Sequence, residues 1–198
     1  MTAQRRRRQA PDLDPQLTLP LNRPVLGLGG GTIPVVIRIE PISLPWAEAL
    51  HLRDEVFAQE CGTQVEPGWA GFPETVPMLV RYARSQQPAV WGPHLVFDDD
   101  GTLIGNGGWK GTPVHGVAEL GYAVAPARRN RGVATALVNH LLTTARDEGL
   151  RLAIAHTLPA ESASTRVLRK CGFHLRETVV DPDDGPVWRW ERQLTPEA

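Results

Sequence analysis

The sequence predicts a mixed α/β domain in which helices cover both faces of a single sheet. Short β-branched runs of strand length alternate with segments whose apolar residues recur at helical spacing. The expected order is one strand, two helices, three strands, a helix, a strand, a helix and two strands. Such an order is typical of a mixed sheet with flanking helices. The 198 residues suffice for one domain with a sizeable core.

The chain divides into a leader and a domain. Residues 1–33 are rich in Pro, Gly and Arg without sustained periodicity, which predicts a flexible leader. Within it, the basic run Arg5–Arg8 either grips phosphates or stays solvated, and the acidic and proline residues that follow favour a solvated tail. The glycines of residues 27–31 only partly resemble a nucleotide loop, because Pro34 and a strand-like run follow where a helix is required. Residues 34–198 are expected to form the single domain.

The first half of the domain supplies an opening strand, two helices and a hairpin. Val35–Ile39 is β-branched and predicts a strand. Trp46–Glu60 and Val76–Ala83 carry apolar residues at helical spacing and predict one helix each. The runs His94–Phe97 and Thr102–Trp109 flank an Asp-Gly turn, which predicts a hairpin.

The second half contains the clearest helix of the chain. Val117–Val124 predicts a strand that is closed by Pro126. Asn130–Glu148 follows, with a broad apolar stripe and with Gly149 at the expected C-terminal cap. The remaining elements are a strand, a helix and a final hairpin, at Arg151–His156, Ser162–Lys170, Leu175–Val180 and Val187–Glu191.

Composition and charge argue against several classes of protein. The formal net charge of −1 gives no overall reason to expect a nucleic-acid or membrane partner. No apolar run approaches membrane-spanning length, and no signal-peptide core follows the basic start, so we expect a soluble cytoplasmic protein, monomeric or homodimeric. Cys61 and Cys171 are far apart and predict buried free thiols. The histidines lack metal-ligand spacing, so we expect no metal.

One loop opens directly into the clearest helix and has the features of an anion site. The first amide groups of a helix have no intrahelical partner, and the helix dipole favours negative charge there. Gly132 lets a ligand approach the backbone, while Arg128, Arg129 and Arg131 supply positive charge. This arrangement suits a pyrophosphate. The Gly-Lys-Ser/Thr of an ATP-binding loop is absent, so Mg-ATP chemistry is not implied.

Two segments resemble those of the GNAT acetyltransferases. Arg129-Asn-Arg-Gly132-Val-Ala134 resembles the family's Gln/Arg-x-x-Gly-x-Gly/Ala signature and, like it, follows a strand and a proline. Residues 159–173 resemble the Pro-x-Asn-x-x-Ser-x-x-x-x-x-Lys-x-Gly-Phe segment of the branch that includes the ribosomal-protein N-terminal acetyltransferases. The resemblance spans roughly residues 35–192. It implies the GNAT fold, a mostly antiparallel twisted sheet of about six or seven strands that splays between the fourth and fifth predicted strands.

The resemblance also implies acetyl-CoA as the co-substrate, without a metal. The pyrophosphate is expected on the amides that begin the long helix, and the pantetheine arm between the two splayed strands, paired with backbone like an added strand. Glu161 stands where the family usually has Asn, whose amide both donates and accepts, so one expected contact is altered. The implied coenzyme contacts are Tyr122, Val124, Arg129, Asn130, Arg131, Gly132, Val133, Ala134, Thr135, Glu161 and Ser164.

Two residues are candidates for proton transfer. Glu119 stands on the strand that lines the coenzyme, where the family often has a carboxylate base; the alternative is a solvent-facing glutamate at the sheet edge. Ser164 occupies the place of the family's serine and is a candidate for protonating the leaving thiolate; the alternative is a hydroxyl that satisfies backbone donors at a helix start. Many family members use a tyrosine four residues later, where this chain has Leu168.

The sequence does not specify the acceptor. Trp69, Phe72 and Trp109 are candidate walls of its pocket, or else anchors of the core and loops. His156 is an alternative base or a substrate contact, or else a packed side chain. A peptide N-terminus, an aminoglycoside, a polyamine and an amino acid all stay open as acceptors.

We therefore expect an N-acetyltransferase that passes an acetyl group from acetyl-CoA to a primary amine, in a small molecule or at a peptide N-terminus. The transfer is expected to proceed by direct attack in a ternary complex, with geometry contributing more than any one side chain. The alternative hypothesis is a non-catalytic acyl-CoA-binding module of the same fold that acts as a sensor or interaction module. Neither hypothesis requires a nucleic acid or a membrane.

Overall fold

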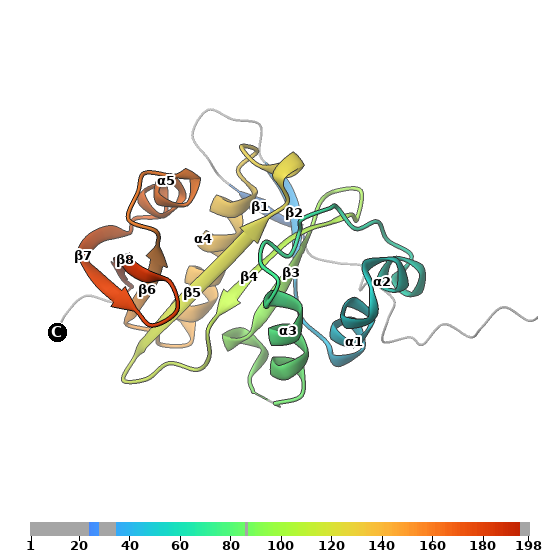
Figure 1. Ribbon diagram of the computed structural model, residues 1–198, viewed down its shortest axis with the longest axis horizontal. Coiled ribbons are helices and arrows are strands. Elements are labelled where there is room, and N and C mark those ends of the chain that lie inside the picture. The colour runs from blue at the N-terminus through green and yellow to red at the C-terminus, as the bar shows by residue number, and fades with distance from the viewer. Residues whose placement is uncertain (1–23, 28–34, 86, 195–198) are drawn as a thin grey trace, which may run out of the picture.

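The computed structural model describes residues 24–27, 35–85 and 87–194 of the chain (Figure 1). Most of the expected leader, including Arg5–Arg8, lies outside these residues. Residues 24–27, which we assigned to the leader, form a strand. Within the described part of the chain, no helix has the length and apolar character needed to cross a membrane.

One eight-stranded sheet runs through the molecule in the order β1-β2-β3-β4-β5-β6-β8-β7. Neighbouring strands are antiparallel except for β5 and β6, which run parallel. All seven expected strands are present, and β1 is an addition that pairs with β2. The strands are β1 (Pro24–Gly27), β2 (Val35–Pro41), β3 (Pro93–Phe97), β4 (Leu103–Trp109), β5 (Val117–Val124), β6 (Leu152–Thr157), β7 (His174–Asp181) and β8 (Gly185–Gln193).

The helices lie in two layers, one on each face of the sheet. Figure 1 shows the first three helices gathered beside β3 and β4, and the other two beside β5 and β6. Each layer has its own cluster of buried side chains, so both faces are covered as the element order predicted. The helices are α1 (Leu44–Leu52), α2 (Asp54–Cys61), α3 (Thr75–Ala83), α4 (Val133–Asp147) and α5 (Ala163–Lys170), with short 3-10 turns η1 (Ala89–Trp91) and η2 (Pro126–Arg128).

Arg53 separates α1 from α2, whereas we expected one continuous helix over Trp46–Glu60. Its backbone is extended, with φ −175° and ψ 155°. The break lets each helix bury an aromatic ring, and the rings of Trp46 and Phe57 meet edge to face at 6.1 Å. A one-residue interruption leaves the helical spacing of the apolar residues almost unchanged, so the sequence pattern does not reveal it.

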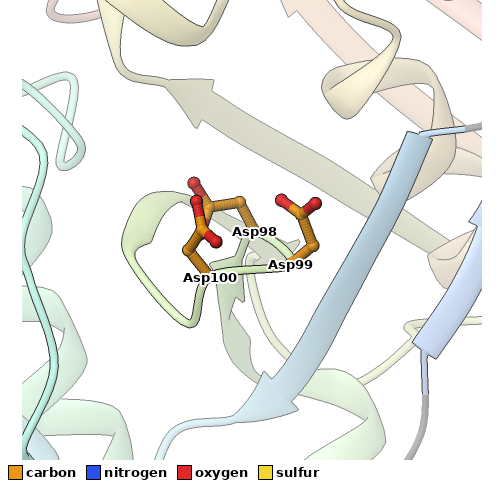
Figure 2. A group of neighbouring side chains, drawn as sticks. All are labelled: Asp98, Asp99 and Asp100. Atoms are coloured by element: carbon orange, nitrogen blue, oxygen red, sulfur yellow. The ribbon is translucent and has the colours of Figure 1, made fainter.

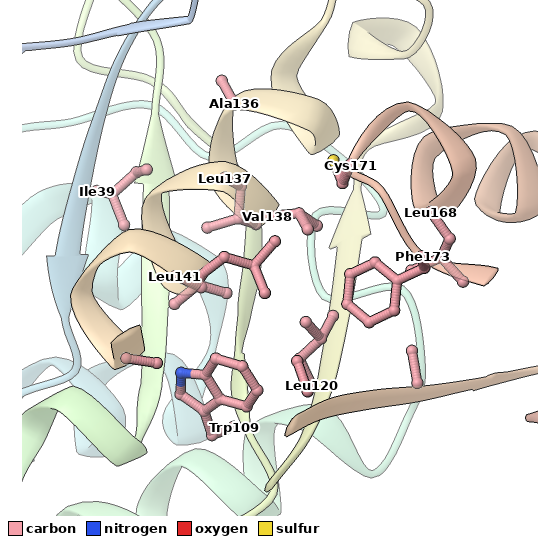
Figure 3. Close-up of a cluster of buried hydrophobic side chains, with 14 of the residues drawn as sticks. Ile39, Trp109, Leu120, Ala136, Leu137, Val138, Leu141, Leu168, Cys171 and Phe173 are labelled. Carbon is pink, nitrogen blue, oxygen red and sulfur yellow. The ribbon is translucent and has the colours of Figure 1, made fainter. Parts of the chain in front are cut away.

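The larger core lies between the sheet and the pair α4 and α5. Figure 3 shows Leu137 and Leu141 of α4 beside Trp109 and Leu120 of the sheet. Each of these side chains is at most 3% exposed. Full burial of one large apolar side chain stabilises a fold by roughly 1.5–3 kcal/mol. This packing fixes α4 against β5 and therefore fixes the ends of the loop that joins them.

Both cysteines are free and buried, as expected. Burial raises the pKa of Cys171 to about 11 and that of Cys61 to about 12. Both side chains are therefore protonated thiols at neutral pH, and they act as small apolar groups in the core rather than as nucleophiles.

Stability should fall as the pH drops from about 6.5 to about 4, because His94 is buried uncharged. The residue is 7% exposed, its Nδ1 lies 3.0 Å from the Gly92 carbonyl oxygen, and burial lowers its pKa to about 4. The unfolded chain, with an imidazole that titrates near ~6.5, takes up a proton in this range that the folded protein does not bind. Urea denaturation should show the free energy of unfolding decreasing by about 3 kcal/mol over this range.

The substitution His94→Gln should remove most of this pH dependence. The exposed His51 provides a control, since His51→Gln leaves the buried imidazole in place. The neighbouring ring of His140, 6.4 Å from that of His94, is retained in both variants. An equally steep loss of stability in His94→Gln would show that another group is responsible.

Candidate active site

The pairing of β5 with β6 ends after three residue pairs. Residues 117–119 pair with residues 152–154. Beyond them, β5 continues beside β4 as far as Val124, and β6 continues beside β8 as far as Thr157. The splay expected between these two strands is therefore present, and it begins immediately beyond Glu119.

Backbone polar groups of β5 face the splay. The carbonyl of Glu119 accepts a bond from the amide of Lys110, on the β4 side. Alternate residues of a strand direct their N–H and C=O groups to opposite neighbours, so those of Tyr122 and Val124 point toward β6, beyond the last pair. The Val124 carbonyl accepts a bond from Arg129 Nε at 3.0 Å. This stretch of β5 is an edge with which an extended ligand can pair.

Three charged or titratable side chains meet where the splay begins. Glu119 Oε1 lies 2.5 Å from Lys110 Nζ and 3.0 Å from His156 Nδ1. The side chains of Glu119 and His156 are each 21% exposed, and that of Lys110 is 59% exposed. We refer to these three residues as the Glu119 group. It is partly shielded from solvent and still within reach of a ligand.

Strand geometry explains why the Glu119 group forms. His156 lies two residues beyond the residue that pairs with Glu119, and alternate residues of a strand share a face. Lys110 directly follows β4, and its amide is bonded to the Glu119 carbonyl at 2.7 Å. All three side chains lie on the face away from α4, because Leu120, the next residue of β5, is buried beneath that helix.

Charges from β7 and β8 surround the Glu119 group. Arg189 of β8 is the ladder partner of His156. At the end of β7, hydrogen bonds from the amides of residues 184 and 183 lower the pKa of Asp181, and nearby Lys110 and His156 lower it further. Asp181 is therefore ionised at neutral pH. The face of the sheet near the splay carries charges of both signs.

Ser164 lies in the first turn of α5 and is tied to β5. The hydroxyl of Tyr122 donates to the Ser164 carbonyl at 3.2 Å and so joins β5 to α5. Burial raises the pKa of Tyr122, which keeps this hydroxyl protonated as a donor. The helix-start role considered for Ser164 belongs instead to Ser162, whose hydroxyl accepts a bond from the Thr165 amide at 3.3 Å.

The expected anion site is an exposed turn before α4. The helix begins at Val133 rather than at Asn130, and Asn130 and Gly132 have positive φ angles of 60° and 85°. Glycine adopts this region without steric cost, and Asn tolerates it better than most residues. No side chain caps the helix, so the amides of residues 133–135 lack intrahelical partners. The exposed Arg131 stands beside them.

Arg128 does not contribute to this anion site as expected. Its Nε lies 2.7 Å from Glu66 Oε2, and its Nη1 lies 2.8 Å from Asp98 Oδ2. Its charge is therefore shared between two carboxylates. These contacts tie the loop after α2 and the β3–β4 turn to the turn that precedes α4. Of the three arginines, only Arg129 and Arg131 retain a place in the expected anion site.

Three carboxylates gather at the β3–β4 turn. Asp98, Asp99 and Asp100 each bring one oxygen within 4.8 Å of the others, and Figure 2 shows them along a single turn. Asp98 is engaged by Arg128 Nη1 and by the amide of Thr102, each at 2.8 Å. These contacts give Asp98 a structural role, which is common for an aspartate in a turn.

Glu161, which directly precedes the N-cap of α5, is bound by side chains of that helix. Arg169 grips both of its oxygens, at 2.6 and 2.7 Å, and the Thr165 hydroxyl donates to one of them at 3.1 Å. These hydrogen bonds, chiefly those from Arg169, lower the pKa of Glu161 to about 2. The carboxylate therefore braces the first two turns of α5 instead of offering free oxygens to a ligand.

Two of the three expected pocket walls are core residues. Trp69 is 2% exposed, and its Nε1 donates to Asp54 Oδ1 at 3.2 Å. Trp109 is 3% exposed and packs beneath α4. The expectation that they line a pocket was wrong, because burial leaves neither ring surface for a ligand. Phe72 is 61% exposed and can contact one.

Asn106 fixes the loop that carries Phe72. Its Nδ2 donates to the carbonyls of Trp69 and Ala70, at 3.0 and 3.1 Å. The adjacent Gly71 packs so closely on β5 that an added Cβ would stand 2.5 Å from the Cβ of Ala123. Side chains an even number of residues apart on a strand share a face, so Ala123 and Glu119 lie on the same face of β5. The loop therefore passes over the face that carries the Glu119 group.

Neither Lys110 nor Asn106 stands out in the sequence as a site residue. Lys110 directly follows a strand, and its relation to Glu119 becomes visible only once the β4–β5 register is known. Asn106 is a lone amide among Gly and apolar residues of β4. A buried amide in such a position needs partners, but nothing in the sequence indicates that the loop after α2 supplies them.

We expect Asn106→Ala to lower the free energy of unfolding by about 1–3 kcal/mol, because the Trp69 carbonyl loses its donor and the Ala70 carbonyl keeps only the Thr75 hydroxyl. Hydrogen exchange should accelerate at the amides of residues 66–72. Asn139→Ala, on the exposed side of α4, is the matched control and should change neither quantity. Unaltered exchange in a destabilised Asn106→Ala variant would show that the loop is held by other contacts.

Comparison with known proteins gives one family match. The model described as the "Acetyltransferase (GNAT) family" matches residues 63–173, which is more than half of the chain. This span contains the β5–β6 splay, the start of α4 and the Glu119 group. Among curated proteins, no sequence matches.

Several solved structures share the fold. A spermidine N-acetyltransferase chimera, in part from Vibrio cholerae, has a TM-score of 0.60 at 17% identity, covering 80% of this chain and 95% of that chain. A microcin self-immunity acetyltransferase in complex with acetyl-CoA and AMP has a TM-score of 0.59 at 15% identity, covering 79% and 92%. A ribosomal-protein alanine acetyltransferase from Vibrio fischeri likewise has a TM-score of 0.59 at 15% identity, covering 79% of this chain and 92% of that chain. At these identities the likeness establishes the GNAT fold alone.

Proposed function

The chain belongs to the GNAT family of acetyl-CoA-dependent N-acetyltransferases, and we propose that it transfers an acetyl group from acetyl-CoA to a primary amine by direct attack in a ternary complex. The observation that carries this proposal is the β5–β6 splay. It begins at Glu119 and leads, through one loop, to the uncapped start of α4. A proton-accepting group and an anion site thus lie at the two ends of one strand edge.

The described residues fit a coenzyme of this kind. The amides of residues 133–135, the dipole of α4 and the side chain of Arg131 suit a pyrophosphate. The backbone of Tyr122 and the amide of Val124 offer hydrogen-bonding groups for an extended pantetheine arm. Bound acetyl-CoA supplies the activated acetyl group as a thioester. Glu161 is absent from this set, because Arg169 and Thr165 occupy its carboxylate.

The Glu119 group suits the acceptor side of the reaction. An attacking amine must be held against the thioester carbonyl and must lose a proton, and Glu119 and His156 together provide partly buried proton acceptors. Positioning supplies roughly 7–11 kcal/mol of such a barrier, and a general base contributes about 10²–10⁴-fold. Ser164, in the first turn of α5, is the proposed donor to the departing sulfur. A sensor would need the anion site without these groups, so they support an enzyme.

We also propose a class of acceptor amine. The segment 159–173 supports the branch that includes the ribosomal-protein N-terminal acetyltransferases, so a peptide N-terminus or a small primary amine is the proposed acceptor. Phe72 is a candidate wall on the acceptor side because it is exposed on the loop that crosses the same face. We propose that the protein acts in the cytoplasm as a monomer or homodimer.

Gly132→Glu should weaken acetyl-CoA binding by at least about 30-fold, because it places a carboxylate against the phosphates at the dipole end of α4. Gly132→Ala is the matched control: it suffers the same strain at φ 85°, roughly 1–2 kcal/mol, without the charge. Titration calorimetry on both folded variants measures the difference. Equal affinities would refute the assignment of the phosphates to this turn.

A panel of amines should yield acetylated product for at least one class. The panel holds peptide N-termini, polyamines, aminoglycosides and amino acids, with thiol release and product mass as the readouts. Turnover identifies the acceptor class. Tight acetyl-CoA binding without thiol release on any amine would instead favour the acyl-CoA sensor.

A further inference from the structure

His156 has two ring nitrogens with different surroundings. Its Nδ1 lies 3.0 Å from Glu119 Oε1, whereas Nε2 has no hydrogen-bond partner among the residues that the structure describes. Resting on the proposed function, we propose that His156 Nε2 accepts the proton of the attacking amine, and that Glu119 is a positioning residue that holds the imidazole. The carboxylate is then not itself the base.

The tautomer follows from the chemistry of the contact. An ionised carboxylate only accepts hydrogen bonds, so Nδ1 must carry the proton in the bond to Glu119. In a neutral imidazole this leaves Nε2 as the unprotonated nitrogen. The side chain of His156 is 21% exposed, so Nε2 can be reached while the ring is held.

The contacts of Glu119 favour this division of roles. Its Oε1 lies between the Lys110 ammonium, at 2.5 Å, and the His156 ring. A proton placed on this carboxylate would cancel the negative charge that both neighbours depend on. A proton taken up by the imidazole instead leaves both of these contacts in place.

Charged groups face His156 from four elements. Glu119 on β5 and Asp181 at the end of β7 supply negative charge, and Lys110 after β4 and Arg189 on β8 supply positive charge. Arg189 is itself paired with Glu191 at 2.9 Å. The direct bond from Glu119 is the contact that sets which nitrogen is free. The imidazolium formed during the reaction stays paired with that carboxylate.

The step balances without a redox partner. The amine nitrogen bonds to the acetyl carbon, the bond from that carbon to sulfur breaks, and the nitrogen's proton passes to His156 Nε2. The departing sulfur receives a proton from water, or from the Ser164 hydroxyl, which then regains a proton from solvent. The imidazolium then returns its proton to solvent, so the products are an amide and a free thiol.

Nitrogen NMR of the coenzyme-free protein tests the tautomer without any turnover. At alkaline pH, where the ring is neutral, wild-type His156 should be mainly protonated on Nδ1. Glu119→Ala should shift the tautomer ratio toward Nε2–H by about tenfold, because one charged hydrogen bond is lost. His174→Gln, at an exposed position of β7, is the control and should leave the His156 signals in place. A wild-type ring protonated mainly on Nε2 would overturn the proposal.

The pH profile of kcat separates the base from the positioning residue. In the wild type, kcat should fall at acidic pH as the base becomes protonated; we call this fall the acidic limb of the profile. His156→Gln should lower kcat about 10²–10⁴-fold and abolish the acidic limb, whereas Glu119→Gln should lower kcat about tenfold and keep it. Both variants should bind acetyl-CoA like the wild type in calorimetry. Loss of the limb in Glu119→Gln, with the limb intact in His156→Gln, would make Glu119 the base.

These outcomes separate the inference from the function it rests on. A wild-type protein that acetylates no amine would defeat the proposed function, and the tautomer measurement would still decide how Glu119 and His156 are arranged. A wild-type protein that turns over, with His156→Gln equally active at every pH, would defeat only the role given to His156.

Discussion

The geometry of the site depends on where the hydrogen-bonded ladder between β5 and β6 stops. Each strand keeps its other neighbour, β4 or β8, beyond the last shared pair. The two halves of the sheet must therefore turn apart. Backbone N–H and C=O groups are obligatory hydrogen-bonding groups. Arg129 satisfies the Val124 carbonyl, and the remaining edge groups of Tyr122 and Val124 need another partner. Packing beneath α4 holds one side of this divergence, and the Tyr122–Ser164 bond links it to α5.

Much of the fold follows from the sequence, because periodicity records which face of an element is buried. The seven expected strands and the apolar stripe of α4 are all present, and the motifs indicated the splay through a family resemblance. Periodicity does not record depth of burial, which is why Trp69 and Trp109 seemed available to a ligand. Nor does it record strand register, without which Lys110 has no visible connection to Glu119.

The candidate site shows the same division between local and tertiary information. The amides at the start of α4 are a local property, and the sequence predicts the helix start at Asn130, three residues before its observed start at Val133. The partners of the arginines in that loop are tertiary: Arg128 is paired with Glu66 and Asp98, which lie far away in the chain. Glu161 likewise looked like a substituted ligand contact until its pairing with Arg169 was known.

The pairing of Arg128 also has a consequence for the order of events at the site. This one guanidinium holds the turn before α4, the loop after α2 and the β3–β4 turn, through Glu66 and Asp98. A ligand that immobilises one of these segments lowers the conformational entropy that a second ligand must remove from the others. Two ligands that each ordered a different one of these segments would therefore bind with positive cooperativity, although they need not touch.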